Sequence, residues 1–224
     1  MSYLNNAFVQ FFELIHKEVT VVFVNQDFAY GISIILVTLI IRLILFPLSL
    51  KQTRSSFAMT AVQPEAKKLQ DKYKNDPQKA QAEVMKLYKE KGASPFSGCL
   101  PMLIQWPIFI ALYYVFNNLT GISGVSFLWI KDLAKADIIL AILSGITTYY
   151  SGMLMMPSTG DQAKQTQIMN ASMSIFMVFI SWKLRSALVM YWVINNLVQV
   201  GQTMLIKKWD AKKKEAKKNE VQKA

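Results

Sequence analysis

The sequence predicts an all-α polytopic membrane protein, and two observations lead to this fold class. Hydrophobic residues make up 53% of the 224-residue chain, and they gather in five long apolar runs. Each run approaches the roughly 20 residues that a helix needs to cross a bilayer core of about 30 Å. Because backbone groups in lipid must pair within their own segment, we expect these runs to be transmembrane helices. They cover residues 30–50, 99–117, 138–156, 168–183 and 186–206.

Residues 1–29 precede the first span and predict an extracytoplasmic amphipathic helix. The segment lacks the basic start and the small-residue cleavage site of a signal peptide. Phe8, Phe11, Phe12 and Ile15 fall on one helical face. This pattern is typical of a helix that lies in the plane of the membrane interface.

A polar insert, residues 51–97, separates the first two spans, and its pattern predicts a cytoplasmic helical hairpin within the core domain 30–206. Asp76 can cap the second helix of the hairpin, Pro77 suits its first position, and Gly92 marks its end. A solvated spacer is the alternative. The apolar residues that recur at helical spacing along the insert are Val62, Ala66, Leu69, Tyr73, Ala80, Val84, Leu87 and Tyr88.

Residues 207–224 form a basic tail with eight lysines and three acidic residues. Three interpretations stay open: a topology signal, adhesion to anionic lipid at about 1 kcal/mol per basic residue, and binding to an RNA-rich particle. Binding of the last kind neutralises phosphates without reading bases, so no specific nucleic-acid sequence is expected.

The basic residues also predict how the chain is oriented in the membrane. Segment 51–91 holds ten Lys and Arg, the tail eight and the 157–167 loop one, against five on the opposite side. Because cationic loops stay in the cytoplasm, we expect the N-terminus outside and the C-terminus inside. Lys183 and Arg185, in the short turn before the last span, are exceptions to this rule.

Arg42 lies inside the apolar run LVTLIIRLILFPL, where a charge costs roughly 2.5–3.5 kcal/mol on insertion scales. At a rise of 1.5 Å per residue, it lies about 18 Å and about 13 Å from the two ends of its span, too far for its side chain to reach either interface. No Asp or Glu falls within the five spans, and the guanidinium stays protonated. We therefore favour a water-filled cavity around Arg42, with pairing to carbonyls or to lipid phosphate as the alternative.

Other polar residues could line such a cavity. Thr38 lies one turn before Arg42 on the same helix face, and Pro47 is expected to kink this helix on its cytoplasmic side. Taken singly, a polar residue in a span is more often a helix–helix hydrogen bond than a functional group. The other spans contribute Gln105, Thr147, Thr148, Asn170, Ser174, Asn195, Asn196 and Gln199.

The chain offers little for catalysis or for metal binding. With a single cysteine, Cys99, and a single histidine, His16, it has no intrachain disulfide and no expected metal site. We expect neither an enzyme nor a cofactor, because no base–nucleophile pair and no phosphate-binding glycine loop is found. A channel or transporter for an anionic solute would use Arg42 as its binding site, although the internal repeat common in transporters is absent.

Six motifs occur in order along the chain: IIRLILFPLSLKQ, QPEAKKLQDKYKND, LYKEKGASPFSGCLPMLIQWPIFIALYY, LWIKDL, GITTYY and ALVMYWVINNLVQVGQT. This series resembles the YidC/Oxa/Alb family of membrane protein insertases, in particular its shorter bacterial members. The resemblance implies a five-helix bundle in the bacterial plasma membrane, with a hydrophilic groove open to the cytoplasm and to lipid. The groove arginine of the family corresponds to Arg42, and positions beside the groove correspond to Thr38, Tyr191 and Trp192. Many members have a glutamine where this chain has Ser and Gly at 151–152.

The resemblance also implies a function. Arg42 would attract acidic residues of a nascent membrane protein, while the apolar helix of the substrate passes along the lipid-open side. Membrane lipid would thus be a second partner. From the polar residues of the other spans, we also expect Gln105 and Thr147 in the groove wall. The hairpin and the tail would position the ribosome or the targeting machinery, and a Sec-type translocon is a further candidate partner.

Overall fold

The computed structural model describes residues 2–92, 100–155 and 161–223, and these residues are mainly helical. The prediction of an all-α fold is confirmed. The helices are α1 (Ser2–Val22), α2 (Gln26–Lys72), α3 (Pro77–Glu90), α4 (Leu100–Asn118), the short 3-10 helix η2 (Thr120–Ile122), α5 (Ile138–Met153), α6 (Asp161–Ser181) and α7 (Ser186–Lys223).

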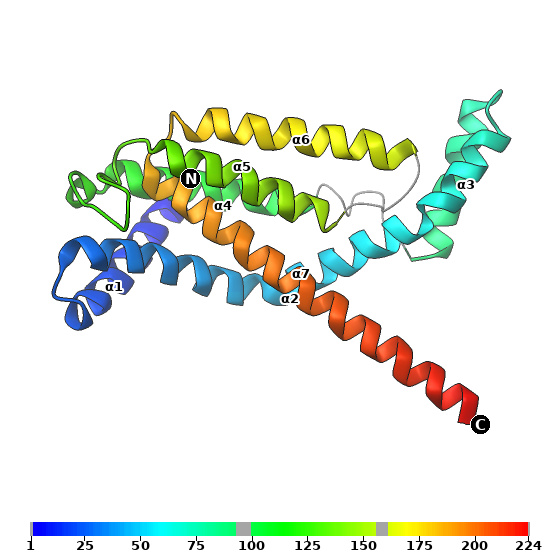
Figure 1. The fold of residues 1–224 in the computed structure, drawn as a ribbon, viewed down its shortest axis with the longest axis horizontal. Coiled ribbons are helices and arrows are strands. Elements are labelled where there is room, and N and C mark those ends of the chain that lie inside the picture. Colours follow the sequence, from blue (N-terminus) through cyan, green and yellow to red (C-terminus); the bar gives the residue numbers. More distant parts are fainter. Residues whose placement is uncertain (1, 93–99, 156–160, 224) are drawn as a thin grey trace.

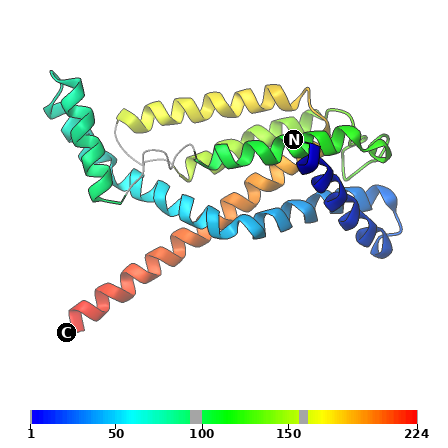
Figure 2. The same cartoon turned by 180° about the vertical axis from the view of Figure 1, so that it is seen from behind.

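Helices α2, α4, α5, α6 and α7 lie alongside one another in an elongated bundle, and α3 and the C-terminal part of α7 extend from one end of it (Figures 1 and 2). Helix α5 packs against both α6 and α7, and α7 packs against α2. At the other end of the bundle, α1 packs against α2 and α4. The two ends therefore differ in which elements surround them.

Helix α2 runs without a break from the first expected span into the first arm of the expected hairpin. The side chain of Asn25 caps its start by accepting hydrogen bonds from the backbone N–H groups of Asp27 and Phe28. Pro47 and Pro64 lie inside the helix, which changes direction along its length (Figure 1). Within the described parts of the chain, α2 is the one helix long and apolar enough to cross a membrane by length and composition, and α5 is a shorter apolar helix. The number of five spans stays a prediction.

Helix α3 folds back on the C-terminal part of α2. The seam between these helices buries Val62 and Ala66 of α2 and Ala80 and Val84 of α3. As expected from the sequence, the Asp76 side chain caps α3, accepting the Lys79 N–H at 3.1 Å, and Pro77 occupies the first turn. The antiparallel pairing follows from Lys91, whose Nζ lies 3.3 Å from Oε2 of Glu65.

Two glycines let α5 approach α6 closely. A Cβ added at Gly145 would lie 2.9 Å from the backbone oxygen of Ser174 and would overlap the side chain of Val178. A Cβ at Gly152 would overlap the side-chain amide of Asn170. Small residues at such contacts are typical of helix packing in membranes, because apolar tails of lipid compete with large apolar side chains.

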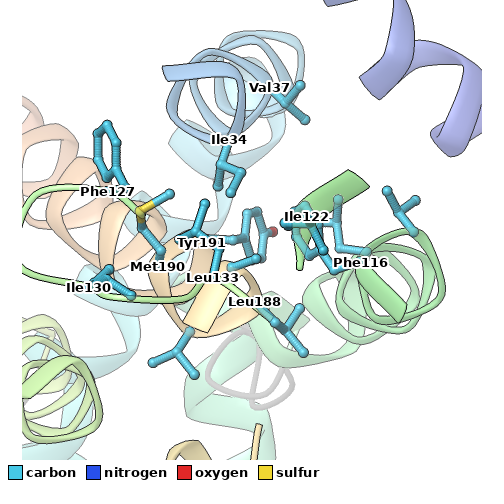
Figure 3. Close-up of a cluster of buried hydrophobic side chains, with 14 of the residues drawn as sticks. Ile34, Val37, Phe116, Ile122, Phe127, Ile130, Leu133, Leu188, Met190 and Tyr191 are labelled. Atoms are coloured by element: carbon cyan, nitrogen blue, oxygen red, sulfur yellow. The ribbon is translucent and has the colours of Figure 1, made fainter. Parts of the chain in front are cut away.

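The main apolar cluster, part of which is drawn in Figure 3, lies at the end of the bundle away from α3 and the tail. It joins the first half of α2, the end of α4, the start of α7 and the connection between α4 and α5, and Phe12 of α1 packs edge-on against Phe116 at 5.6 Å. Close-packed interiors of this kind leave few voids large enough for water. The fully buried members with large side chains are Phe12, Ile34, Phe116, Ile122, Ile130, Leu133, Leu112, Leu188 and Tyr191.

The connection between α4 and α5 closes this apolar end. Phe127 and Ile130 exchange backbone hydrogen bonds of 2.9 Å each, and the ring of Phe127 packs directly on Gly31 of α2, where any Cβ would overlap it. The carboxylate of Asp132 accepts the N–H of Gly124 at 3.1 Å and that of Ala134 at 2.9 Å. Gly124 has φ of +78°, a backbone conformation that glycine adopts without strain.

The outer surfaces of the helices carry many large apolar side chains. Soluble monomers rarely expose apolar patches of more than a few hundred Å². Exposure on this scale therefore agrees with helices that face lipid. The most exposed of these residues in α2, α6 and α7 are Leu43, Ile44, Ile168, Met169, Ile175, Phe179 and Leu205.

Candidate functional site: a polar cavity around Arg42

A cavity of about 40 Å³ lies toward the end of the bundle that carries α3 and the tail. Helices α2, α4 and α7 supply its walls, together with Met155, which follows α5. A volume of roughly 10–15 Å³ already holds one water molecule when polar partners are present, so the cavity has room for a small polar group and water. It is lined by Arg42, Leu45, Leu48, Ser49, Gln52, Thr53, Gln105, Met155, Gln199, Gln202 and Thr203.

Arg42 enters this cavity from α2 and is held by α7. Its Nε donates to Oδ1 of Asn195 at 2.6 Å, and its Nη2 donates to the backbone oxygen of Asn195 at 2.8 Å and to Oε1 of Gln199 at 3.0 Å. Asn195 and Gln199 are four residues apart on α7 and therefore share one helix face. The residue Arg42 is only 9% exposed.

These bonds use one edge of the guanidinium and leave the other edge unpaired. Arginine has five N–H donors, and the two on Nη1 have no hydrogen-bond partner among the described residues. Nor does any described carboxylate form an ion pair with Arg42. Both sequence interpretations therefore describe part of the site: a backbone carbonyl does accept from Arg42, and the guanidinium also borders a polar cavity.

Gln52 adds a second donor to the cavity wall. It lies on α2, ten residues after Arg42, and it is 8% exposed. Its buried Nε2 has no hydrogen-bond partner within the described part of the chain. A buried donor left unsatisfied costs about 1–3 kcal/mol, so this amide is available to water or to a ligand in the cavity.

Gln105 connects the cavity to the apolar core. Its Nε2 donates to the hydroxyl of Tyr191 at 2.6 Å, and its Oε1 accepts from Nδ2 of Asn195 at 3.3 Å. Tyr191 is 1% exposed and its ring belongs to the apolar cluster. Arg42, Asn195, Gln105 and Tyr191 thus form one hydrogen-bonded chain across α2, α7 and α4.

A second polar cluster lies beside the first, between α5 and α7. Nδ2 of Asn196 donates to Oγ1 of Thr148 at 3.0 Å and to Oγ1 of Thr147 at 3.4 Å. Nε1 of Trp192 donates to the same Thr148 oxygen at 3.0 Å, and the Trp192 ring packs edge-on against Phe109 at 5.7 Å. This cluster ties α5 to α7 and does not line the Arg42 cavity.

The structure therefore brings together some of the residues expected at the site and separates others. Arg42 and Gln105 line one cavity, Tyr191 contacts it through Gln105, and Thr147 and Trp192 belong to the α5–α7 cluster. Thr38 is fully buried and its hydroxyl donates to the backbone oxygen of Ile34 at 2.7 Å, so it points back along its own helix.

The sequence alone does not identify several residues that contact Arg42 or line its cavity. Asn195 and Gln199 are polar residues of the last span, but nothing in the sequence pairs them with Arg42, which lies more than 150 positions away. Gln52 falls in the polar insert, because it lies beyond the last apolar residue of its run. A helical projection of α2 would have placed Ser49, Gln52 and Thr53 below Arg42 on overlapping faces.

The arrangement of donors around this cavity suits reversible binding of an anion. Among the described residues, no group of three or more His, Cys, Asp or Glu side chains could hold a metal ion. Arg42 provides charge, and Nη1 and the Gln52 amide provide donors. Since one edge of Arg42 is already engaged, an incoming carboxylate could not form the side-on pair through Nε and Nη2 that makes arginine–carboxylate contacts strong.

Comparison with known proteins reveals close relatives over almost the whole chain. The family model described as 60Kd inner membrane protein matches residues 22–215. A protein of Clostridium tetani named membrane protein insertase YidC is 60% identical over 214 residues, which cover 95% of this chain and 97% of the relative. The protein of the same name from Clostridium acetobutylicum is 52% identical over 228 residues, covering 98% and 89%.

The fold also matches a solved structure. A crystal structure of an active YidC insertase, with its first transmembrane domain resolved, superimposes with a TM-score of 0.69 at 33% sequence identity. The match covers 90% of this chain but 45% of the solved chain, so the present chain spans less than half of that relative.

Proposed function

The chain belongs to the YidC family of membrane protein insertases, and we propose that it moves nascent protein segments into the bilayer by way of the cavity around Arg42. The observation that supports this most directly is the half-engaged guanidinium. Its Nε and Nη2 are held by α7, while Nη1 keeps its donors at a polar cavity without a carboxylate of the described chain. An acidic residue of a substrate would be the missing counter-charge.

The strength of this attraction depends on how much water surrounds the pair. Two unit charges 4 Å apart attract by about 1 kcal/mol in water and by about 4 kcal/mol at the effective dielectric constant of 20 typical near protein surfaces. Because Arg42 is buried but borders a polar cavity, we expect its attraction for a carboxylate to lie near the second value. Attachment is therefore weak enough for the segment to leave again, which insertion requires.

A substrate segment that enters the bundle as far as Arg42 has a shorter path left to cross through the hydrocarbon of the membrane. A polar tail that reaches the cavity from the side of α3 has crossed part of the membrane among amide, hydroxyl and guanidinium groups. The tail must then still cross the part of the membrane that surrounds the apolar end of the bundle. The apolar helix of the substrate follows along the lipid-facing surface beside Leu43 and Ile44, driven by the removal of its side chains from water.

The proposed orientation, in a bacterial plasma membrane, places the N-terminus outside, and α3 and the tail inside the cell. The hairpin 51–97 and the tail 207–224 would recruit the ribosome or targeting machinery, and a Sec-type translocon would be a further partner.

Arg54 pairs with Asp210 at 2.8 Å, so α2 contacts the start of the tail helix. Removing residues 212–224 keeps this pair and should weaken salt-sensitive co-sedimentation with ribosomes; unchanged co-sedimentation would assign the tail to another role.

The mechanism is tested by replacing Arg42 in cells depleted of their own insertase. Arg42→Lys retains a charge and should support insertion of a substrate with an acidic tail, whereas Arg42→Ala should lose it. Lys51→Ala, which removes an exposed cation from the same helix outside the cavity, is the matched control. Each variant is also assayed with a substrate whose tail carboxylates are changed to amides, and on this substrate Arg42→Ala should match the unmodified chain.

This design separates charge from folding. If Arg42→Ala inserts both substrates as well as the unmodified chain does, the electrostatic step is wrong. If it fails equally on both, Arg42 acts as a structural residue through Asn195 and Gln199. Thermal unfolding of the purified variants in detergent shows independently whether the bundle has been weakened.

A further inference from the structure

A second cavity, of about 200 Å³, lies at the opposite end of the bundle from the Arg42 cavity. It is formed where the end of α4 meets the turn between α6 and α7. Tyr113, Phe116 and Asn117 supply one wall, and Lys183, Arg185 and Leu188 supply the other. Its size far exceeds the roughly 10–15 Å³ that one water molecule needs, so it can accommodate a larger polar group.

The charge of this cavity is positive. Lys183 and Arg185 are the two basic residues that depart from the expected charge bias of the chain, and the described residues that line the cavity include no Asp or Glu. The two carboxylates of the adjoining connection are engaged elsewhere. Asp132 accepts from two backbone N–H groups and pairs with Lys135, and Asp137 caps α5 by accepting from the N–H of Leu140.

Arg185 is positioned to bind an anion. Its Nη1 donates to the backbone oxygen of Phe116 at 2.6 Å, which fixes the guanidinium against the end of α4. Its remaining donors have no hydrogen-bond partner among the described residues. The ammonium group of Lys183 is exposed and lies 5.1 Å from the centre of the Phe179 ring, a contact that leaves its N–H donors available.

Aromatic residues indicate that this cavity lies at the level of lipid headgroups. Trp182 precedes Lys183 and is exposed, as are Tyr113 and Tyr114 of α4. Tyr and Trp gather at both membrane–water interfaces, where their apolar rings and polar tips meet the headgroups. Phe179, one turn before Lys183, exposes its ring as a lipid-facing residue would.

We propose that this cavity binds the phosphate group of an anionic phospholipid in the leaflet opposite the basic tail. The free donors of Arg185 and the ammonium group of Lys183 would share the phosphate oxygens, as charged donors do in strong phosphate contacts. A headgroup bound there connects α4 to the α6–α7 turn. The inference depends on the placement of the bundle in a membrane but not on the role of Arg42, so either can fail without the other.

The test measures binding of defined lipids to the full chain purified in neutral detergent. Native mass spectrometry counts phosphatidylglycerol and phosphatidylcholine bound to each molecule, and a parallel titration uses inorganic phosphate. The chain should retain phosphatidylglycerol in preference to phosphatidylcholine. Lys183→Gln should weaken this binding about fivefold, since one basic residue near an anionic lipid surface contributes about 1 kcal/mol.

Two further variants make the result specific. Lys183→Arg keeps the charge and should retain binding, and Lys131→Gln, which removes a cation from the neighbouring connection without touching the cavity, should change binding little. Equal loss in Lys131→Gln and Lys183→Gln would overturn the site in favour of general surface attraction. Equal retention of both lipids, or binding of inorganic phosphate alone, would also overturn it.

Discussion

The two ends of the bundle are built from the same helices but are packed in different ways. In α2, Ile34, Val37 and Ile41 belong to the apolar core, and one residue later Arg42 begins the polar cavity. In α7, Leu188 is part of the core, whereas the second half of the span presents Asn195, Gln199 and Thr203. Each helix thus changes from apolar to polar at about the same depth.

This difference shows how one bundle can bury an apolar core toward one end and a polar cavity toward the other. Branched and aromatic side chains interdigitate at the apolar end, and the α4–α5 connection covers them (Figure 3). At the other end, polar side chains of α2, α4 and α7 surround a cavity beside the guanidinium. Stability should therefore depend on the first end and specificity for charge on the second.

The largest expected effect comes from matched truncations of leucine at the two ends. Leu112 is fully buried in the core, whereas Leu48 lines the Arg42 cavity and is 39% exposed. Leu112→Ala should lower the free energy of unfolding by about 2–5 kcal/mol, and Leu48→Ala by less than about 1 kcal/mol. Equilibrium unfolding in mixed micelles measures both values. Similar losses would show that the cavity end is packed as tightly as the core.

Replacing each of two glutamines of the cavity wall by leucine should change the free energy of unfolding in different directions. Gln105→Leu removes bonds to Tyr191 and Asn195 and should cost about 1–3 kcal/mol of unfolding free energy. Gln52→Leu removes an unpaired buried donor and should leave this free energy unchanged or raise it by about 1 kcal/mol, while reducing insertion of acidic substrates. A loss of stability in Gln52→Leu, measured in the same micelles, would show that this amide has a structural partner.

The smallest effect is expected in the connection that closes the apolar end. Burial alone would raise the pKa of Asp132, but hydrogen bonds from the N–H groups of Ala134 and Gly124, and the nearby Lys135, bring the pKa below its ordinary value of 3.8. The folded state therefore binds a proton less readily than the unfolded state. The stabilisation is present above pH 3.8 and is lost as the pH falls through the lower pKa of the folded protein.

Asp132→Asn should remove this dependence on pH and lower the unfolding free energy at neutral pH by about 1 kcal/mol. Unfolding measured between pH 3 and pH 7 compares the slopes of the two proteins. The same slope in both would mean that Asp132 does not contribute. Lys131→Gln, in the same connection, is a control for the loss of one surface charge.

The positions of the helices could be predicted closely because a long apolar run is costly to place anywhere but in lipid or a core. Helices α4, α5 and α7 begin within one residue of the expected spans. Helix ends were predicted less well. Hydropathy marks where a helix leaves lipid, whereas backbone hydrogen bonding continues into water, so α6 begins at Asp161, seven residues before its apolar run.

The sequence predicts that the candidate site is a polar region around a charged residue, but it does not predict which side chains contact one another there. A charge among apolar residues singled out Arg42, and polar residues in the other spans indicated a polar interior. The rotation of each helix about its axis and its position along the bundle decide which of these polar residues meet. Neither quantity can be read from the sequence of a single segment. Thr38 illustrates this: it shares a helix face with Arg42 by spacing, yet its hydroxyl is satisfied by its own backbone.

Arg42 has a consequence beyond hydrogen bonding, because its charge is balanced by no carboxylate of the described chain. A charge fixed within a bilayer is subject to the transmembrane voltage, worth about 2.3 kcal/mol per elementary charge for 100 mV across the full thickness. With the cell interior negative, the same voltage drives acidic residues of a substrate outward. If a substrate carboxylate pairs with Arg42 as proposed, the two charges cancel and the voltage would exert little net force on the pair. The guanidinium would then mark the depth at which the voltage stops driving the substrate.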